Sequence, residues 1–338
     1  MHYLGRSATA RRRFGFLACM ALAAWLAVSL AGCQKQVAGD HPECIAPAKP
    51  GGGYDLTCRL LANGLTETGL MTTPMIVSYM PGGIGAVAYN HVNATRDHDG
   101  DLVVAASTGA AVNLALGKFG SYDADAVRWL GAFAADYGVL VVAADSPYKN
   151  LSDLVAALKQ DPGSVVAGAG GSIGSQDWMK IALVAKRAAG VDPRDLRFVS
   201  YEGGGEAMGS LLGHHIDVFT GDASEMAGHI GSGKIRVLAI LSDERLGGVY
   251  KDIPTAKEQG YDIEWPTWRG FYMGPNVSDE NYDAWVARLK ELVATDQFKT
   301  MRAKQGLFPE ARFGADFDAY VVNQAREFET LAKQVGLK

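Results

Sequence analysis

The sequence predicts an α/β protein of two lobes, in which mostly parallel strands are flanked by helices. Short apolar runs rich in β-branched residues alternate with helical patterns almost to residue 275, and this alternation is typical of parallel strands connected by helices. The chain has 338 residues, of which 48% are apolar, so its length favours two domains. Glycine-rich segments recur between predicted strands and helices, where such folds commonly bind ligands.

The elements follow from the apolar patterns. Candidate strands, in chain order, cover residues 75–79, 102–106, 129–133, 139–143, 164–169, 196–200, 216–220, 235–241 and 270–274. Candidate helices cover residues 55–68, 84–95, 152–160, 175–189, 206–213, 222–232, 279–294 and 315–334. Asp55 is placed to cap the first helix, and Ser175 can cap the helix that Gly190 stops.

The first 33 residues differ from the rest of the chain. Arginines at 11–13 precede an apolar run over 14–30, which ends in Leu30-Ala31-Gly32-Cys33. These features are typical of a signal peptide, and a single membrane-spanning helix is the alternative because the run is just long enough to span. Residues 30–33 resemble the lipobox of bacterial lipoproteins. The resemblance implies cleavage before Cys33, lipidation of Cys33, a tether over 34–43, and a periplasmic protein anchored to the membrane.

Charge and cysteine usage narrow the class further. The formal net charge is −5, which argues against a nucleic-acid partner. Cys19 lies in the signal segment and Cys33 would carry lipid, so Cys44 and Cys58 remain as one pair in an oxidising compartment. We predict a disulfide between them, with two buried free thiols as the alternative.

Four glycine clusters carry the predicted chemistry, and they span residues 50–55, 81–85, 168–175 and 201–205. Glycines permit positive φ angles and close approach, so that successive N–H groups can point at one spot. A following helix adds partial positive charge to those donors. Several such loops around one cleft would bind a carboxylate without requiring lysine or arginine.

Three other kinds of site are weaker alternatives. Gly170-x-Ser172-x-Gly174 matches the nucleophile elbow of a hydrolase, but the last histidine of the chain is His229, and no oxyanion motif is visible. A secreted, lipid-anchored esterase with Ser172 as nucleophile remains the rival function. The segment 83–88 fits a dinucleotide fingerprint poorly. The histidines show no metal-ligand spacing, so we expect neither metal nor cofactor, and no catalytic residue.

The clusters together resemble the substrate-binding receptors of tripartite tricarboxylate transporters, also called Bug receptors. The similar segments begin at 48–55 and continue through 81–85, 170–175, 201–205, 217–222, 252–255 and 268–270. Segments 43–47 and 264–270, with Cys58, resemble the tricarboxylate-binding branch. The sequence departs from the family's common pattern at two positions. Tyr54 stands where relatives often have a small or hydroxylated residue, and Glu202 stands where many relatives have lysine.

This resemblance implies a type II periplasmic-binding-protein fold with a ligand cleft between two α/β lobes. Residues 44–142 and 264–338 would form lobe 1 and residues 143–263 lobe 2, with chain crossings near 143–146 and Glu264. It also implies a monomeric solute-binding lipoprotein that passes a small carboxylate, above all a citrate-like tricarboxylate, to the membrane permease subunits of a tripartite tricarboxylate transporter.

The resemblance also implies which residues bind the ligand. These are Gly52, Gly53, Tyr54, Asp55, Ser107, Thr108, Gly171, Ser172, Gly174, Ser175, Tyr201, Gly203, Gly204, Thr220, Asp222 and Arg269. Arg269 is the cation expected near the cleft, and a structural ion pair is its alternative role.

Overall fold

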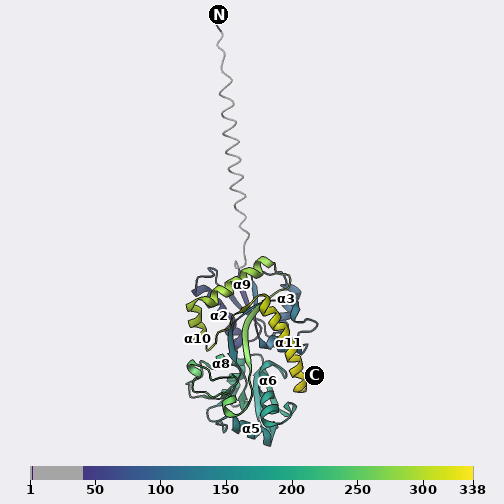
Figure 1. The fold of residues 1–338 in the computed structure, drawn as a ribbon, viewed down its shortest axis with the longest axis vertical. Helices are drawn as coiled ribbons and strands as arrows, with labels where there is room; N and C mark the ends of the chain where they lie inside the picture. The colour runs from purple at the N-terminus through teal and green to yellow at the C-terminus, as the bar shows by residue number, and fades with distance from the viewer. Residues whose placement is uncertain (1, 3–40, 338) are drawn as a thin grey trace. The chain divides into compact units, whose positions relative to one another are not determined.

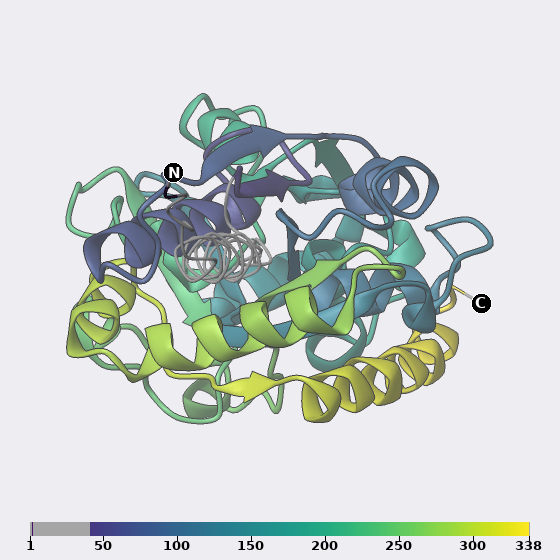
Figure 2. The ribbon, with the colours of Figure 1, turned by 90° about the horizontal axis from the view of Figure 1, so that it is seen from above.

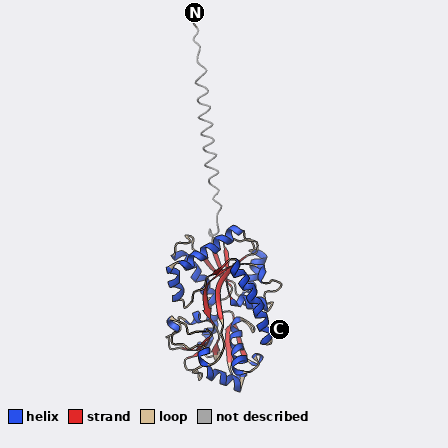
Figure 3. Ribbon diagram, in the orientation of Figure 1, coloured by secondary structure: helices blue, strands red, loops and turns tan. Residues whose placement is uncertain are grey.

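The computed structural model describes residue 2 and residues 41–337. The predicted signal peptide, the lipidation at Cys33 and most of the tether therefore lie outside the described residues. The elements below belong to one compact unit, Ala38–Lys338. Their strands form two sheets covered by helices, and each sheet with its helices is called a lobe here (Figures 1 and 3).

The first lobe is built on a six-stranded mixed sheet. Its order is β11 (Arg312–Phe313), β4 (Arg128–Tyr137), β10 (Pro266–Met273), β3 (Leu102–Ser107), β1 (Glu43–Ala46) and β2 (Ile76–Tyr79). Strand β1 is parallel to β2 and β3, whereas β10 is antiparallel to β3 and β4.

Helices cover both faces of this sheet and surround its strands in the view from above (Figure 2). They are α2 (Gly53–Glu67), α3 (Ala86–Thr95), α4 (Thr108–Ala115), α9 (Asp279–Ala294), α10 (Asp296–Lys304) and α11 (Ala315–Gln334). Alternation along β10 divides the core. Phe271 packs with α2, α9 and α10, while Trp268 and Tyr272 pack with α3, α4 and α11.

The second lobe is built on a five-stranded mixed sheet. Its order is β7 (Arg197–Tyr201), β6 (Val166–Gly170), β8 (Val218–Phe219), β5 (Val139–Ala143) and β9 (Ile235–Ile240). Its helices are α5 (Leu151–Gln160), α6 (Gln176–Leu183), α7 (Gly204–Leu212) and α8 (Ala223–Met226). Trp178 of α6 is 2% exposed and anchors one face of this lobe's core.

The chain passes between the lobes at adjacent points. It changes sheets at Gly138, between β4 and β5, which is earlier than the expected 143–146. It returns before β10, and the Gly138 N–H donates to the Trp265 carbonyl at 2.9 Å, so the two crossings lie side by side. A third link is α11, because Phe328 and Val335 pack on the second-lobe core.

Helix ends confirm one predicted cap and correct another. Ser175 Oγ accepts a hydrogen bond from Trp178 N at 3.3 Å, as expected of a cap. Its helix continues as a π-helical turn, Val184–Ala189, and Gly190 follows with φ of 71°. In contrast, α2 begins at Gly53, so Asp55 is not its cap. The Asp55 carboxylate instead accepts from Gly51 N at 2.9 Å.

The sheets are mixed rather than mostly parallel. Parallel pairs occur where a helix connects successive strands, as between β6 and β7. The antiparallel pairs involve strands next to the crossings, because β4 leaves the first lobe and β10 returns to it in the opposite direction. The elements β1, α4, α10 and β11 were not predicted. The two strands have only 4 and 2 residues, too few for a clear period.

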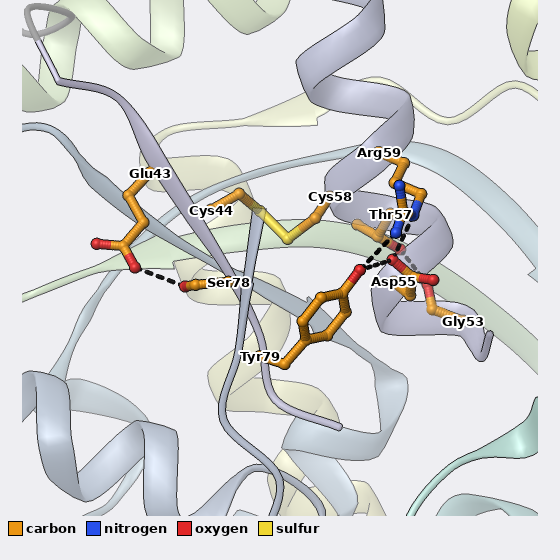
Figure 4. The surroundings of a disulfide bond; sticks show 9 residues. All are labelled: Glu43, Cys44, Gly53, Asp55, Thr57, Cys58, Arg59, Ser78 and Tyr79. Atoms are coloured by element: carbon orange, nitrogen blue, oxygen red, sulfur yellow. Dashed lines mark hydrogen bonds and ion pairs between the residues drawn. A yellow bond between two sulfur atoms is a disulfide. The ribbon is translucent and has the colours of Figure 1, made fainter. Parts of the chain in front are cut away.

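The predicted disulfide between Cys44 and Cys58 is present, with a Cα–Cα distance of 5.6 Å. It links β1 to the second turn of α2 (Figure 4). None of the helices within residues 41–337 combines the length and apolar character needed to cross a membrane.

Candidate functional site

A small cavity of about 40 Å³ lies between the lobes. The first lobe lines it with Ala48, Gly52, Gly53, Tyr54, Ile84 and Arg269, and the second with Gly170, Gln176, Asp177, Gly203, Gly204, Asp222 and Glu225. A volume of this size has room for about three water molecules. The lobes therefore pack closely at this point, and this cavity as it stands has no room for a larger solute.

Three helices begin at this cavity. Gly53 and Tyr54 open α2, Gln176 and Asp177 open α6, and Gly204 opens α7. The first N–H groups of a helix have no partner within the helix, and the helix dipole makes this end partly positive. The cavity therefore meets the positive ends of helices from both lobes.

Close packing explains the glycines at two of these starts. A Cβ atom at Gly53 would overlap the Arg269 guanidinium, and one at Gly204 would overlap the Glu225 carboxylate. The predicted glycine clusters of the two lobes also touch, because a Cβ atom at Gly205 would lie 3.1 Å from the Gly51 carbonyl oxygen. Beside them, Lys49 N donates to the Glu202 carbonyl at 3.3 Å. The sequence prediction that these loops converge is met for residues 51–54 and 203–205.

A buried ion-pair network forms the wall behind the cavity. Arg269 Nη2 lies 2.7 Å from Asp136 and 2.8 Å from Asp222, so it links the first lobe to the second. Lys180 Nζ lies 2.6 Å from Asp177 and 2.7 Å from Asp222. Both cations are almost fully buried and are engaged by carboxylates. The structure thus places Arg269 beside the cavity in the role of a structural ion pair.

Burial and neighbouring charges shift the pKa values of the acids in this network in different directions. Burial raises the pKa of Glu225 to about 8, and the neighbouring Asp177 and Asp222 act in the same direction. Burial also raises the pKa of Asp177 to about 6, against the attraction of Lys180. Although burial opposes it, Lys180 and Arg269 together lower the pKa of Asp222. Asp222 is thus the carboxylate that stays ionised most readily.

Comparisons with known proteins assign the chain to a family. The model of the tripartite tricarboxylate transporter family receptor matches residues 57–337. The chain belongs to this receptor family. BugT of Bordetella pertussis is 25% identical over 321 residues, which cover 92% of this receptor and 95% of BugT.

Solved structures agree in fold. MatC of Rhodopseudomonas palustris with bound malate has 19% identity and a TM-score of 0.76, and the match covers 86% of this receptor and 98% of MatC. A second R. palustris protein, with adipate, has 20% identity and a TM-score of 0.77, covering 88% and 97%. These likenesses confirm the periplasmic-binding-protein fold, and the family confirms that this receptor is not an enzyme.

A second cavity of about 240 Å³ lies next to the first and shares Ile84 with it. Its other lining residues are Lys49, Gly83, Gly171, Ser172, Ser200, Tyr201, Glu202 and Glu206. We call it the outer cavity and the smaller one the inner cavity. The predicted residues Gly171, Ser172 and Tyr201 thus line the outer cavity rather than the inner one.

Several predicted residues hold the receptor's fold instead of lining either cavity. Asp55 pairs with Arg59 at 2.6 Å and accepts from the Tyr79 hydroxyl (Figure 4). Thr108 accepts from Trp268 N, and Thr220 donates to the Asp177 carbonyl.

Ser107, Gly174 and Ser175 lie close by without lining a cavity. The Ser107 hydroxyl hydrogen-bonds to the lining residues Tyr54 and Gln176 at 3.5 and 3.4 Å. A Cβ atom at Gly174 would meet Leu116, Lys118 and Leu337 at 3.1 to 3.2 Å.

The surroundings of Ser172 do not resemble a hydrolase triad. Its hydroxyl accepts a hydrogen bond from Lys118 Nζ at 3.2 Å, and within residues 41–337 no histidine bonds to it. The described residues also contain no group of three or more histidine, cysteine or acidic side chains arranged for a metal ion.

Sequence reasoning missed Asp136, Gln176, Asp177, Lys180 and Glu225. Two of these residues could have been noticed in the sequence. Asp136 is a charge within a strand whose neighbours are apolar, and Lys180 lies on the buried side of α6 next to Ile181. A charge in such a position is rarely buried unless it is paired, so each predicts a buried partner without naming it.

Proposed function

We propose that this receptor captures a small carboxylate between its lobes outside the cytoplasm and delivers it to membrane permease subunits. The observation that carries the proposal is the convergence of three helix N-termini, those of α2, α6 and α7, on one interlobe cavity. Such termini offer unpaired N–H donors and partial positive charge to an anion. The family membership supplies the transport role.

Capture would require the lobes to open and close. The inner cavity holds about 40 Å³, so a ligand enters only when the lobes are apart. Rotation at the two adjacent crossings, near Gly138 and Trp265, would separate the lobes as in other hinged binding proteins. Residues 44–138 with 266–338, and residues 139–265, would then move as the two bodies.

The ligand class draws on relatives and on the sequence. Relatives of the same fold are solved with malate and with adipate, which are small carboxylates. The resemblance to the tricarboxylate-binding branch extends this set to a citrate-like ligand. The buried acids around the inner cavity favour a ligand with fewer carboxylates, since like charges repel in a water-poor site.

The compartment follows from the disulfide and the N-terminal segment. Disulfides persist in oxidising spaces such as the periplasm, and Cys44–Cys58 is such a bond. The signal-like residues 1–33 agree with export, and lipidation at Cys33 would anchor the receptor beside its permease.

Thermal unfolding in the presence of carboxylates tests the proposal. A solute that binds the native state raises the midpoint of unfolding in a concentration-dependent manner. We expect at least one member of a panel of mono-, di- and tricarboxylates, including malate, adipate and citrate, to do so. Amino derivatives of these acids belong in the same panel. If none shifts the midpoint at millimolar concentration, carboxylate capture is wrong.

A further inference from the structure

The inner and outer cavities meet at a boundary between the lobes. Along three loops, neighbouring residues line opposite cavities: Ala48, Gly170 and Gly203 line the inner cavity, while Lys49, Gly171 and Glu202 line the outer one. Within residues 41–337, only Ile84 lines both cavities. The two cavities are therefore adjacent compartments of one interlobe space, and Ile84 lies where they meet.

The Ile84 side chain reaches across this boundary from the first lobe to the second. A Cβ atom placed on Gly171 would lie 3.1 Å from Ile84 Cγ1. Elsewhere the boundary is backbone, because a Cβ atom at Gly170 would lie 3.1 Å from the Gly203 carbonyl carbon, and one at Gly203 would lie 3.2 Å from the Lys49 carbonyl oxygen. The glycines have no side chain to withdraw, so a shorter side chain at position 84 would widen the passage.

The backbone of Ile84 is held in a conformation that isoleucine rarely adopts. Its φ is 45° and its ψ is 61°, in the left-handed region, where a β-branched residue is strained. The Ile84 carbonyl accepts a hydrogen bond at 2.9 Å from Asn113 Nδ2, and Asn113 of α4 is 2% exposed. Strained conformations persist only where the surroundings enforce them, and they cluster at functional sites. The buried amide thus holds in place the loop that carries Ile84.

We propose that Ile84 limits the length of the ligand, because its side chain separates the helix starts around the inner cavity from the space of the outer cavity. This inference rests on the proposed function and adds the residue that selects by size. An acid with one carboxylate at the starts of α2, α6 and α7 can extend only as far as Ile84. A longer acid must displace this side chain, against its contact with Gly171 and the hydrogen bond from Asn113.

Two substitutions separate the side chain from the strain of its backbone. Ile84→Ala removes most of the side chain and keeps a Cβ atom at positive φ, whereas Ile84→Gly removes the whole side chain and also relieves the strain. Val87→Ala is the matched control, since Val87 of the neighbouring α3 is 49% exposed and lines neither cavity. Thermal unfolding without ligand verifies that each variant is folded.

A series of linear dicarboxylates of increasing length, from succinate to suberate, tests the inference. Titration calorimetry at pH 7 measures the affinity of each acid for the unmodified chain and for the three variants. We expect the affinity for suberate relative to succinate to rise at least tenfold in both Ile84→Ala and Ile84→Gly, and to stay unchanged in Val87→Ala. An unchanged ratio in the two Ile84 variants overturns the inference. A rise in Ile84→Gly alone also overturns it, because backbone freedom would then be the cause.

The outcomes distinguish this inference from the proposed function. If some carboxylate binds the unmodified chain but neither Ile84 variant gains affinity for the longer acids, only the size limit at Ile84 is wrong. If no carboxylate binds any form of the chain, the proposed function itself has failed, and the inference fails with it.

Discussion

The two lobes present unlike faces to the inner cavity. The first lobe offers the start of α2 and one cation, Arg269, whose charge Asp136 balances. The second lobe offers the starts of α6 and α7 and three carboxylates, those of Asp177, Asp222 and Glu225, with Lys180 as their single cation. Closure therefore joins a face of balanced charge to an acidic one. The difference teaches that shape alone does not hold the lobes together, because Arg269 of the first lobe supplies positive charge to Asp222 of the second.

Removing the cation of the first-lobe face should have the largest effect. In Arg269→Met, Asp136 and Asp222 lose the guanidinium that lies 2.7 and 2.8 Å away. Breaking one side of a buried pair costs about 3–5 kcal/mol of unfolding free energy, measurable by urea titration. Lys299→Met is the control, because its pair with Asp296 is exposed and should cost about 0–1 kcal/mol. Equal losses in the two variants would mean that the network does not hold the lobes together.

The disulfide belongs to the first lobe alone, where it holds α2 against β1. Replacing Cys44 and Cys58 by serine opens a loop with a sequence separation of 14. A closed loop of that length stabilises a protein by about 3 kcal/mol. We expect a loss of that size in chemical unfolding. Reductant should destabilise the unmodified chain similarly and leave the double variant unaffected, and a reductant effect on the double variant would contradict this account.

Adding one methyl group to each glycine loop compares the two faces directly. Gly53→Ala directs a Cβ into Arg269, and Gly204→Ala directs one into Glu225. Each should cost about 1–3 kcal/mol through overpacking and weaken ligand binding. Gly209→Ala in α7 is the control, because open space surrounds it and alanine should stabilise the helix by about 1 kcal/mol. Unchanged affinity in Gly53→Ala would place the ligand elsewhere.

The pH dependence of stability reports the acidic face. Because the folded-state pKa of Glu225, about 8, lies above its ordinary 4.5, the folded chain binds more protons than the unfolded chain between those values. The unfolding free energy should therefore fall as pH rises through this window. The pKa of Asp177 is raised from 3.8 to about 6. Its titration therefore also lowers the unfolding free energy as pH rises, in a lower pH range.

Glu225→Gln should flatten that fall by up to about 3 kcal/mol between pH 5 and 8. Thermal unfolding across this pH range measures the difference, with Glu327→Gln, which changes an exposed glutamate on α11, as control. A fall that is as steep in Glu225→Gln as in the unmodified chain would assign the titration to another group.

The smallest effect belongs to the exposed contact between the lobes. Lys49 and Glu206 pair at 3.3 Å, and their side chains are 49% and 44% exposed. Lys49→Ala should cost less than about 0.5 kcal/mol and less still at high salt. Urea titrations at low and high ionic strength measure this. A larger, salt-insensitive loss would show that closure depends on the rim rather than on the buried network.

Local sequence patterns determined much of this receptor. The helix 279–294 was predicted with the bounds that α9 has, because an amphipathic period is written within the helix itself. The cap at Ser175 is likewise a local feature. The Cys44–Cys58 pair could be predicted because these two cysteines remain once Cys19 and Cys33 are assigned to the N-terminal segment. The four glycine clusters were recognised as loops before helices, and residues of all four, at 52–54, 83–84, 170–172 and 201–204, line the interlobe cavities.

Only the tertiary structure decided which side chains line the interlobe cavities. Asp136 and Arg269 are 133 positions apart in the chain, and Arg269 and Asp222 are 47 apart, yet they form one network. No local period can specify such pairs, since they depend on how two sheets meet at the crossings. For the same reason the sequence did not reveal that Thr108, Thr220 and Asp55, which it predicts as ligand-binding residues, line neither interlobe cavity and bond to other parts of the fold. Sequence fixes which backbone can bend and donate, whereas assembly of the lobes fixes which charges share the enclosed space.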